Sequence, residues 1–461
     1  MIMTTSTSQN THETDTANNA SYTTISTILT LAIPTFGQLI AEPAFVLIDT
    51  AIVGHIGGQA LAGMSVGSTI VLTVVGLCVF LAYSTTTQVG RLLGAGKRSE
   101  GLEAGIDGLW LAGIIGVVVS VALFVIARPL CTAMGAQGSV LHNAVDYVRA
   151  VVFGIPGMLL VYAANGIFRG LQKVHITLIA AMVGAILNTL LDLLFILGFG
   201  WGVFGSGVAT LISQWFMAVA LIVPSVLWTR AEGARLRPRL SGVLNSAGDG
   251  AVLFLRTLAL RACLVANVVL ATHMGVEVLA AYQVVNSSWN FVLNMLDAIG
   301  IAGQTLVAAQ IGARQEDEAM RLTRIAGKAG LCGGMVIGIG LMIAGWCASP
   351  LFSQSTEIRH LLTVGMMVVG VTLPLAGWMW AVDGILIGAG DYRYLALTCT
   401  ATAAIYVPCL AAIGWICDAM QASSALRMAL LWLAVNLLFV GLRAIFNGFR
   451  IGTSAWLHIA Y

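Results

Sequence analysis

The chain has 461 residues, of which 58% are hydrophobic and only 9% are charged, and its formal net charge is +2. Soluble proteins carry a charge on about a quarter of their residues, so this composition excludes a soluble globular protein and indicates a polytopic membrane protein. The small net charge also argues against a nucleic-acid partner.

The chain begins with a polar segment, MIMTTSTSQNTHETDTANNASYTT, which is rich in Thr, Ser and Asn. We expect residues 1–24 to form a disordered cytoplasmic tail, because so few apolar side chains cannot support a fold. The segment does not resemble a signal peptide, which would have a basic region followed by a short apolar core. Twelve apolar runs follow, and a spanning helix needs roughly 20 such residues. Their centres lie near residues 40, 75, 117, 157, 187, 217, 261, 293, 336, 373, 404 and 436. The sequence therefore predicts an all-α protein with twelve transmembrane helices.

The basic residues lie unevenly about these runs. Most of the 22 Lys and Arg residues fall in the even-numbered loops or the C-terminal tail, and we count Arg169 and Arg443 among them. Basic loops stay on the cytoplasmic side of a membrane. We therefore expect a multi-pass protein of the cytoplasmic (inner) membrane with both termini in the cytoplasm.

The sequence repeats itself at one offset of 218 residues, without gaps. The rarer residues carry this repeat, because His55 falls on His273 and Pro156 falls on Pro374. Each copy contains six helices, an even number, so the two copies have the same orientation in the membrane and are related by an axis along the membrane normal. Two bundles that face each other across such an axis predict a central cavity between them. The expected division is an N-lobe (25–228), a cytoplasmic linker (229–248), a C-lobe (249–447) and a cytoplasmic tail (448–461).

Acidic residues inside apolar spans point to a functional site. Each would cost roughly 2.5–3.5 kcal/mol at the centre of a bilayer if ionised, so we expect them to face the interior of the bundles. The structural alternative is that such a carboxylate only ties helices together by hydrogen bonds. Five acidic residues lie well inside the predicted spans: Glu42, Asp49, Asp192, Asp297 and Asp383.

In the first half, Asn188 and Asp192 lie one turn apart on the fifth helix and share a face. An amide and a carboxylate in an apolar helix make half of a site for a proton or a small cation. Asp49 in the first helix is placed to complete it. We interpret these residues as a device that couples ion binding to a conformational change.

The two halves distribute their polar residues differently, since Asp49 falls on Asn267 and Asp383 falls on Asn165. Two arginines, Arg256 and Arg261, lie inside the seventh helix. An Arg–Asp pair would neutralise two buried charges. We therefore expect a structural role for Asp297, whereas Asp383 is open to either a structural or a functional role.

The aromatic and thioether side chains near the centres of spans 8 and 10 are candidates for the wall of the cavity. A soft aromatic surface suits flat organic cations, although plain packing explains such residues equally well. The candidates are Trp289, Trp378, Met379 and Trp380.

Seven segments in chain order resemble one known family, the multidrug and toxic-compound extrusion (MATE) transporters, in their DinF-like branch. They are EPAFVLIDTAIVGHIG, QVGRLLGAGK, GIFRGLQK, LNTLLDLLF, LRTLAL, LDAIGIAGQTLVAAQIGA and AVDGILIGAGD. The resemblance implies two six-helix lobes and an antiporter, not an enzyme, that exports organic compounds by using an inward H⁺ or Na⁺ gradient. We expect a monomer whose two lobes alternate access, which exports cationic or amphipathic drugs or metabolites in exchange for H⁺ rather than Na⁺. It implies no cofactor and no metal beyond the coupling ion.

The resemblance also assigns residues. It places the coupling cation at Asp49, with Asn188, Asp192 and Thr210 around it, and it matches Asp383 to an acidic position of the related NorM-like branch. The acidic partner that this branch carries in helix 7 is missing here, which argues against a sodium site in the C-lobe.

Two alternatives stay open. A flippase for lipid-linked precursors or polysaccharides, from the same wider superfamily, would need a large basic cavity, and only Arg256 and Arg261 are predicted as bases within the spans. An intramembrane enzyme would use Asp49 and Asp192 as a catalytic dyad. ATP-driven transport is not supported, because the chain has no Walker motif and no soluble domain.

Overall fold

The computed structural model describes residues 9–347, 349 and 355–459, together with the side chains of these ranges from residue 25 onward except those of Glu42 and Phe45. Within this part of the chain there are twelve helices long and apolar enough to cross a membrane, and no strand. Backbone polar groups inside a bilayer must be satisfied within the chain itself, which apolar runs achieve as helices. The predicted all-α polytopic fold is confirmed.

The first six spans form the N-lobe. Three of them are broken: the second into α2 and α3, the fourth by a 3₁₀ turn η1 ahead of Pro156, and the fifth by a π-helical turn η2 directly after Asp192. Proline lacks a backbone N–H, so it is accommodated at the start of the helix that follows η1. The elements are α1 (Gln9–Gly54), α2 (Gly58–Leu77), α3 (Phe80–Gly94), α4 (Arg98–Ala133), α5 (Gly138–Val151), η1 (Val152–Gly154), α6 (Ile155–Gly170), α7 (Val174–Asp192), η2 (Leu193–Gly198) and α8 (Gly202–Ala231).

The other six spans form the C-lobe, in which glycines let helices approach closely. A methyl group placed on Gly330 of the ninth span would come within 2.3 Å of the Gly377 carbonyl oxygen in the tenth, so only a small residue fits there. The elements are α9 (Leu240–His273), α10 (Val276–Gly312), α11 (Glu316–Cys347), α13 (Thr356–Gly388), α14 (Tyr392–Ala419), α15 (Ser424–Leu433), the π-helical turn η3 (Ala434–Phe439) and α16 (Val440–Ile451).

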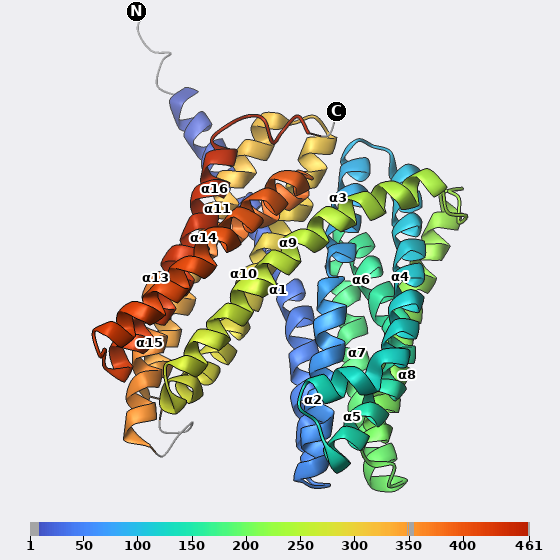
Figure 1. Cartoon of the computed structure of the whole chain (residues 1–461). Helices are drawn as coiled ribbons and strands as arrows, with labels where there is room; N and C mark the ends of the chain where they lie inside the picture. The colour runs from blue at the N-terminus through green and yellow to red at the C-terminus, as the bar shows by residue number, and fades with distance from the viewer. Residues whose placement is uncertain (1–8, 348, 350–354, 460–461) are drawn as a thin grey trace, which may run out of the picture.

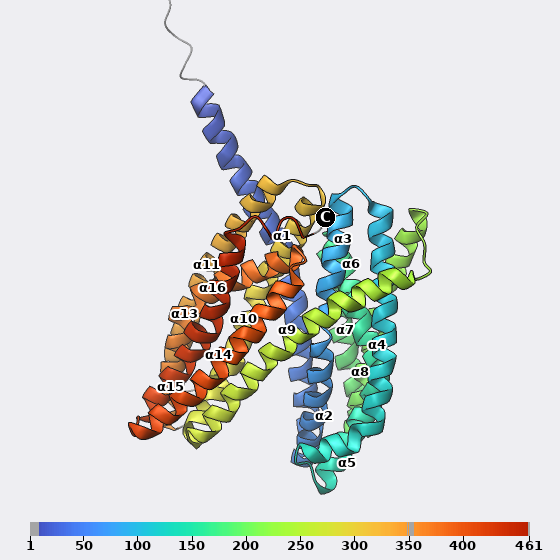
Figure 2. The same cartoon turned by 45° about the horizontal axis from the view of Figure 1, so that its top comes forward.

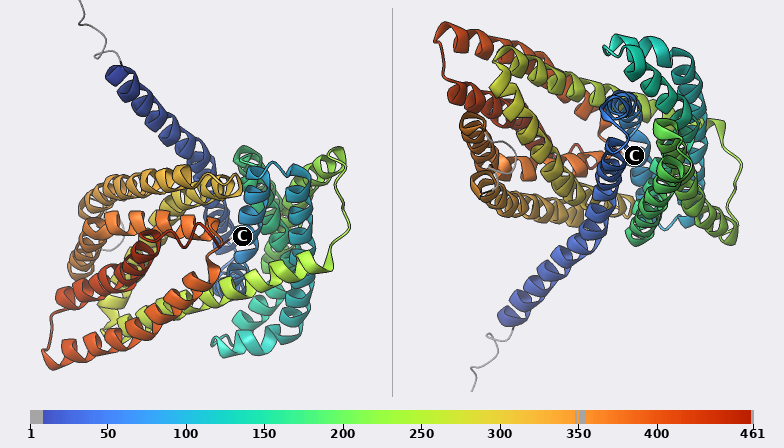
Figure 3. Two further views of the ribbon diagram at one scale, coloured as in Figure 1. Left: turned by 90° about the horizontal axis from the view of Figure 1, so that it is seen from above. Right: turned by 90° about the horizontal axis from the view of Figure 1, so that it is seen from below.

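The two lobes stand side by side (Figure 1, Figure 3). The start of α1 and the end of α16 lie at the same end of the molecule, as an even number of spans requires. The helices of the two lobes meet at this end and diverge toward the opposite one, which carries the α1–α2 and α9–α10 connections (Figure 2). Seen along the bundles, the beginning of α1 extends away from both lobes.

The lobes are held together where α3 meets α10 and the end of α13. The Gln304 amide donates to the Tyr83 carbonyl oxygen at 2.9 Å, and the Thr87 hydroxyl donates to the Ile387 carbonyl oxygen at 3.0 Å. We name this contact between α3, α10 and α13 the closed interface.

Two expectations about the segments outside the spans differ from the structure. Helix α1 begins at Gln9, so the tail expected over 1–24 is helical from Gln9 onward, and residues 1–8 lie outside the described residues. An existing helix extends at little cost once it is nucleated. Helix α9 begins at Leu240, within the expected linker, and the backbone N–H of Arg239 is fixed to Asp107 of the N-lobe at 2.9 Å.

Candidate functional site

A cavity of about 730 Å³ lies between the lobes. Its walls come from α1, α2, α3, α6, α7 and α8 of the N-lobe and from α9, α10, α13 and α16 of the C-lobe. The central cavity predicted from the repeat is therefore present, and its volume falls within the range of pockets that bind drug-sized molecules.

In the N-lobe, Asp49 of α1 is 3% exposed and accepts a hydrogen bond of 2.7 Å from the Ser206 hydroxyl of α8. Asp192, the last residue of α7, is fully buried and interacts electrostatically with Asp49. Neither carboxylate takes part in an ion pair with a described basic residue within 4 Å. The structure therefore brings the two predicted carboxylates together. We name Asp49 and Asp192 the carboxylate pair.

Asp192 and Asn188 have unused polar atoms. Both carboxylate oxygens of Asp192 and both side-chain polar atoms of Asn188 are buried without a hydrogen-bond partner among the described residues. Buried polar atoms are nearly always satisfied, so this arrangement leaves ligands available for a proton or a small cation. The side chain of Glu42 lies outside the described residues.

Asp49 of the carboxylate pair lines a small pocket next to the central cavity. This pocket of about 20 Å³ is lined by Asp49, Thr210, Tyr147 and Gln214, and Gln214 also lines the central cavity. Thr210, which the resemblance assigns to the surroundings of the coupling cation, lines the same small pocket as Asp49 and Tyr147.

Sequence reasoning missed Ser206 and Tyr147 in this region. Ser206 precedes Thr210 by four residues in GSGVATLISQ, so helical spacing would have placed both on one face. No comparable signal marked Tyr147, because α5 reaches the site only through the packing of the lobe.

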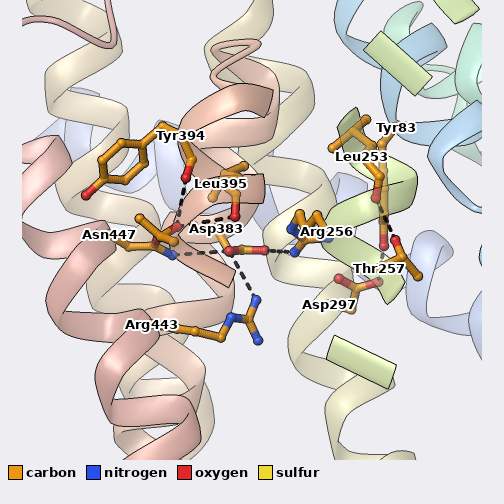
Figure 4. Close-up of polar contacts among 11 residues, drawn as sticks. Tyr83, Leu253, Arg256, Thr257, Asp297, Asp383, Tyr394, Leu395, Arg443 and Asn447 are labelled. Atoms are coloured by element: carbon orange, nitrogen blue, oxygen red, sulfur yellow. Dashed lines mark hydrogen bonds and ion pairs between the residues drawn. The ribbon is translucent and has the colours of Figure 1, made fainter. Parts of the chain in front are cut away.

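In the C-lobe, Asp383 of α13 is the centre of a buried network (Figure 4). Arg256 of α9 forms an ion pair with one carboxylate oxygen. The other oxygen accepts from Arg443 and from Asn447 of α16, each at 3.1 Å. An Arg–Asp pair thus forms at Asp383, the residue for which the sequence left a structural and a functional role open.

Asp297 of α10 was expected to have a structural role in an Arg–Asp pair, but the structure does not pair it with an arginine among the described residues. It forms no ion pair within 4 Å with a described residue, and its contact is a long hydrogen bond of 3.5 Å from the Tyr83 hydroxyl of α3. The sequence placed Arg256 and both aspartates inside the C-lobe spans, and Figure 4 shows that the Arg256 side chain points to Asp383 and not to Asp297.

Two arginines assigned to loops from the sequence lie inside the protein instead. Arg169 of α6 and Arg443 of α16 are 4% and 3% exposed, and both line the central cavity. They sit near the ends of their spans, where sequence position alone cannot tell a loop residue from one that points inward. Arg169 falls on Ile387 in the repeat, and Ile387 also lines the cavity.

The asparagines and Arg261 lie at different places. Asn165 and Arg261 line the central cavity, as does Asp383. Asn267 does not: it is buried inside the C-lobe, where it accepts a hydrogen bond of 2.5 Å from the Tyr406 hydroxyl. The repeat-related residues Asn165 and Asp383 therefore both line the cavity, whereas Asn267 has a hydrogen-bond partner inside the C-lobe.

Of the four aromatic and thioether candidates, only Trp380 lines the cavity. Trp289 is 2% exposed and packs edge-on against Trp380, Met379 is fully buried, and Trp378 packs against the hydrophobic cores. Plain packing, the alternative considered for these residues, holds for the other three.

The comparisons with known proteins agree with this architecture. A family model described as MatE matches residues 34–194 and 253–413, one match in each lobe. The chain is 24% identical to Protein DETOXIFICATION 42 of Arabidopsis thaliana over 92% of this chain and 91% of that protein. It is 25% identical to DNA damage-inducible protein F of Escherichia coli strain K12, over 90% of this chain and 89% of that protein.

A solved structure is similar over the same extent. The crystal structure of the Vibrio cholerae MATE transporter VcmN in the bent form has a TM-score of 0.85 and 19% identity, covering 95% of this chain and 99% of that one. The paired matches of the family model coincide with the two lobes, and the relatives cover nearly the whole chain. This chain is a transporter of the MATE family, in its DinF-like branch.

Proposed function

We propose that the chain is a secondary antiporter that exports organic compounds in exchange for H⁺, with the proton held at the carboxylate pair. The observation that carries this proposal is the burial of the carboxylate pair, in which Asp49 lines the small pocket next to the central cavity and the oxygens of Asp192 have no hydrogen-bond partner among the described residues. Two carboxylates removed from water cannot both keep their charge unless a proton or a cation joins them. Loading and unloading that ion then changes the packing of α1 and α7, which both border the cavity.

The surroundings of Asp383 in the C-lobe differ from those of the carboxylate pair, and this difference supports a proton site in the N-lobe. The charge of Asp383 is already balanced by Arg256 and Arg443, so it leaves no place for a coupling cation. The role of Asp383 in this proposal is structural, because its loss would leave two buried arginines without a counter-charge, whereas an unpaired carboxylate responds to ions.

The orientation of basic residues places both termini in the cytoplasm in this proposal. The closed interface then lies on the cytoplasmic side, and the lobes diverge toward the outside (Figure 1). We therefore assign the structure to the outward-facing half of an alternating-access cycle in the inner membrane, with the chain working as a monomer on small organic substrates.

The test is gradient-driven transport of xanthene dyes by the purified chain in liposomes, with a pH gradient or a sodium gradient imposed. We expect the pH gradient to drive transport of a dye, and Asp49→Asn to lower the rate by at least about tenfold, within the usual range of coupling between two sites. Asp192→Asn should behave in the same way.

Asp146→Asn is the matched control, because Asp146 lies in the same lobe but is partly exposed and pairs with His142 at 3.3 Å. Its rate should equal that of the unchanged chain. Transport that follows only the sodium gradient, or an Asp49→Asn variant that transports at full rate, would show that the carboxylate pair is not the proton site.

A lipid-linked precursor flippase is the second candidate, because the cavity has four arginines rather than the expected two. The volume of about 730 Å³ argues for smaller ligands, since it is the size of a pocket for a drug-like molecule.

A further inference from the structure

The central cavity has an excess of positive charge. Its described lining includes four arginines, two aspartates and no lysine, histidine or glutamate. Asp383 neutralises only one of its two arginine partners, Arg256 and Arg443. The balance of the described lining residues is therefore positive in a largely apolar pocket.

Arg261 of α9 has no ion pair with a described residue within 4 Å and is exposed to the cavity. Its guanidinium extends from the C-lobe to α2 of the N-lobe, where a methyl group placed on Gly76 would lie only 3.0 Å from it. The absence of a side chain at Gly76 leaves room for this group. Arg261 can therefore contact a ligand that lies between the lobes.

Arg169 provides a second basic group from the opposite lobe. It donates to the Gln38 side-chain oxygen at 3.2 Å, and its Nε is buried without a hydrogen-bond partner among the described residues. Arg169 as a whole is 4% exposed, and buried guanidinium nitrogens in proteins nearly always have an acceptor. Carboxylates and phosphates are the acceptors that guanidinium groups bind best.

The aromatic wall does not offset this charge. Trp380, the only one of the predicted cation-binding candidates in the lining, has its ring covered by Arg443, whose Cζ lies 5.1 Å from the ring centroid. The face that would attract an organic cation already holds one.

We infer that the substrate of the central cavity is an amphipathic organic anion, bound through its carboxylate or another acidic group by Arg169 and Arg261. This inference deepens the proposed antiporter function and rests on it. It replaces the cationic compounds expected from the aromatic residues, because the charges in the lining repel a cation.

The experiment compares two dyes that share a xanthene scaffold but have opposite charge, fluorescein and rhodamine 123. Fluorescence anisotropy with the purified full chain in detergent at pH 7.5 gives the dissociation constant of each. We expect fluorescein to bind at least about tenfold more tightly than rhodamine 123, and Arg261→Gln to weaken fluorescein binding by about tenfold, the loss of one charge-assisted contact.

Arg261→Lys should retain most of the fluorescein affinity, because the charge stays, whereas Arg261→Glu should reverse the preference between the dyes. Arg149→Gln is the control, since Arg149 is exposed on α5 and does not line the cavity. Because Arg261 is exposed, these variants should fold like the unchanged chain. Arg169→Gln tests the second group.

Tighter binding of rhodamine 123, or fluorescein binding that Arg261→Gln leaves unchanged, would overturn the inference. So would displacement of fluorescein by a lipid-linked pyrophosphate at lower concentrations than by a soluble aromatic carboxylate, which would support the flippase instead. Dye binding needs no gradient. A result in which fluorescein binds as expected but no pH gradient drives transport would therefore reject only the proposed antiport.

Discussion

Asp383 and Asp297 line the same cavity, but Asp383 has charged partners and Asp297 has an uncharged one. Asp383 contacts Arg256, Arg443 and Asn447, whereas Asp297 has no ion pair within 4 Å among the described residues and accepts one long hydrogen bond from the Tyr83 hydroxyl at 3.5 Å. A buried ion pair contributes little net stability, but the loss of one partner leaves the others as uncompensated buried charges. The two aspartates should therefore respond differently to the same substitution.

We predict that Asp383→Ala destabilises the protein by about 3–5 kcal/mol, because Arg256 and Arg443 stay buried without their carboxylate. The measurement is the midpoint temperature of thermal unfolding of the purified, detergent-solubilised chain, monitored by its aggregation. We expect this midpoint to be lowered. Asp297→Ala is the control and should lower the midpoint much less. Equal effects of the two substitutions would contradict the structural role assigned to Asp383.

At the scale of elements, two glycines related by the repeat hold the closed interface together. A methyl group on Gly94 of α3 would come within 1.9 Å of the Ala309 carbonyl oxygen, and one on Gly312 of α10 within 2.0 Å of the Arg91 carbonyl oxygen. The helices approach each other here as closely as backbones can, because neither position has a side chain. Any larger residue must move α3 away from α10.

We predict that Gly94→Val opens the closed interface and shifts the protein away from the conformation described here. Spin labels on the ends of α3 and α10 would report this as a longer or broader distance distribution than in the unchanged chain. Gly340→Ala is the matched control, since nothing lies within 4 Å of a methyl group placed there. An unchanged distance distribution in Gly94→Val would mean that the interface does not depend on this contact.

At the scale of the whole molecule, the orientation in the membrane decides which way the cavity faces. We predict that a cysteine at Gln137, which is exposed in the α4–α5 connection, reacts with a membrane-impermeant maleimide in intact cells. A cysteine at Ala95, exposed in the α3–α4 connection, should react only after permeabilisation. Both substitutions are made in a variant of the chain in which the eight native cysteines are replaced. The reverse pattern would place both termini outside and make the described conformation inward-facing.

The sequence by itself determined the twelve spans, their division into two related lobes and the shared face of Asn188 and Asp192 on one helix. These features follow from the length and polarity of contiguous segments, from a repeat at one offset and from the spacing of one turn between two polar residues of an apolar helix.

Only the tertiary structure decided which charges meet. Arg256 pairs with Asp383 rather than Asp297, Arg169 and Arg443 turn inward, and three of the four aromatic and thioether candidates lie in the cores. The reason is that a helical sequence fixes which residues share a face, whereas the rotation of that face and the crossing of one helix over another depend on packing across the whole molecule. The positive lining of the cavity arises from this packing.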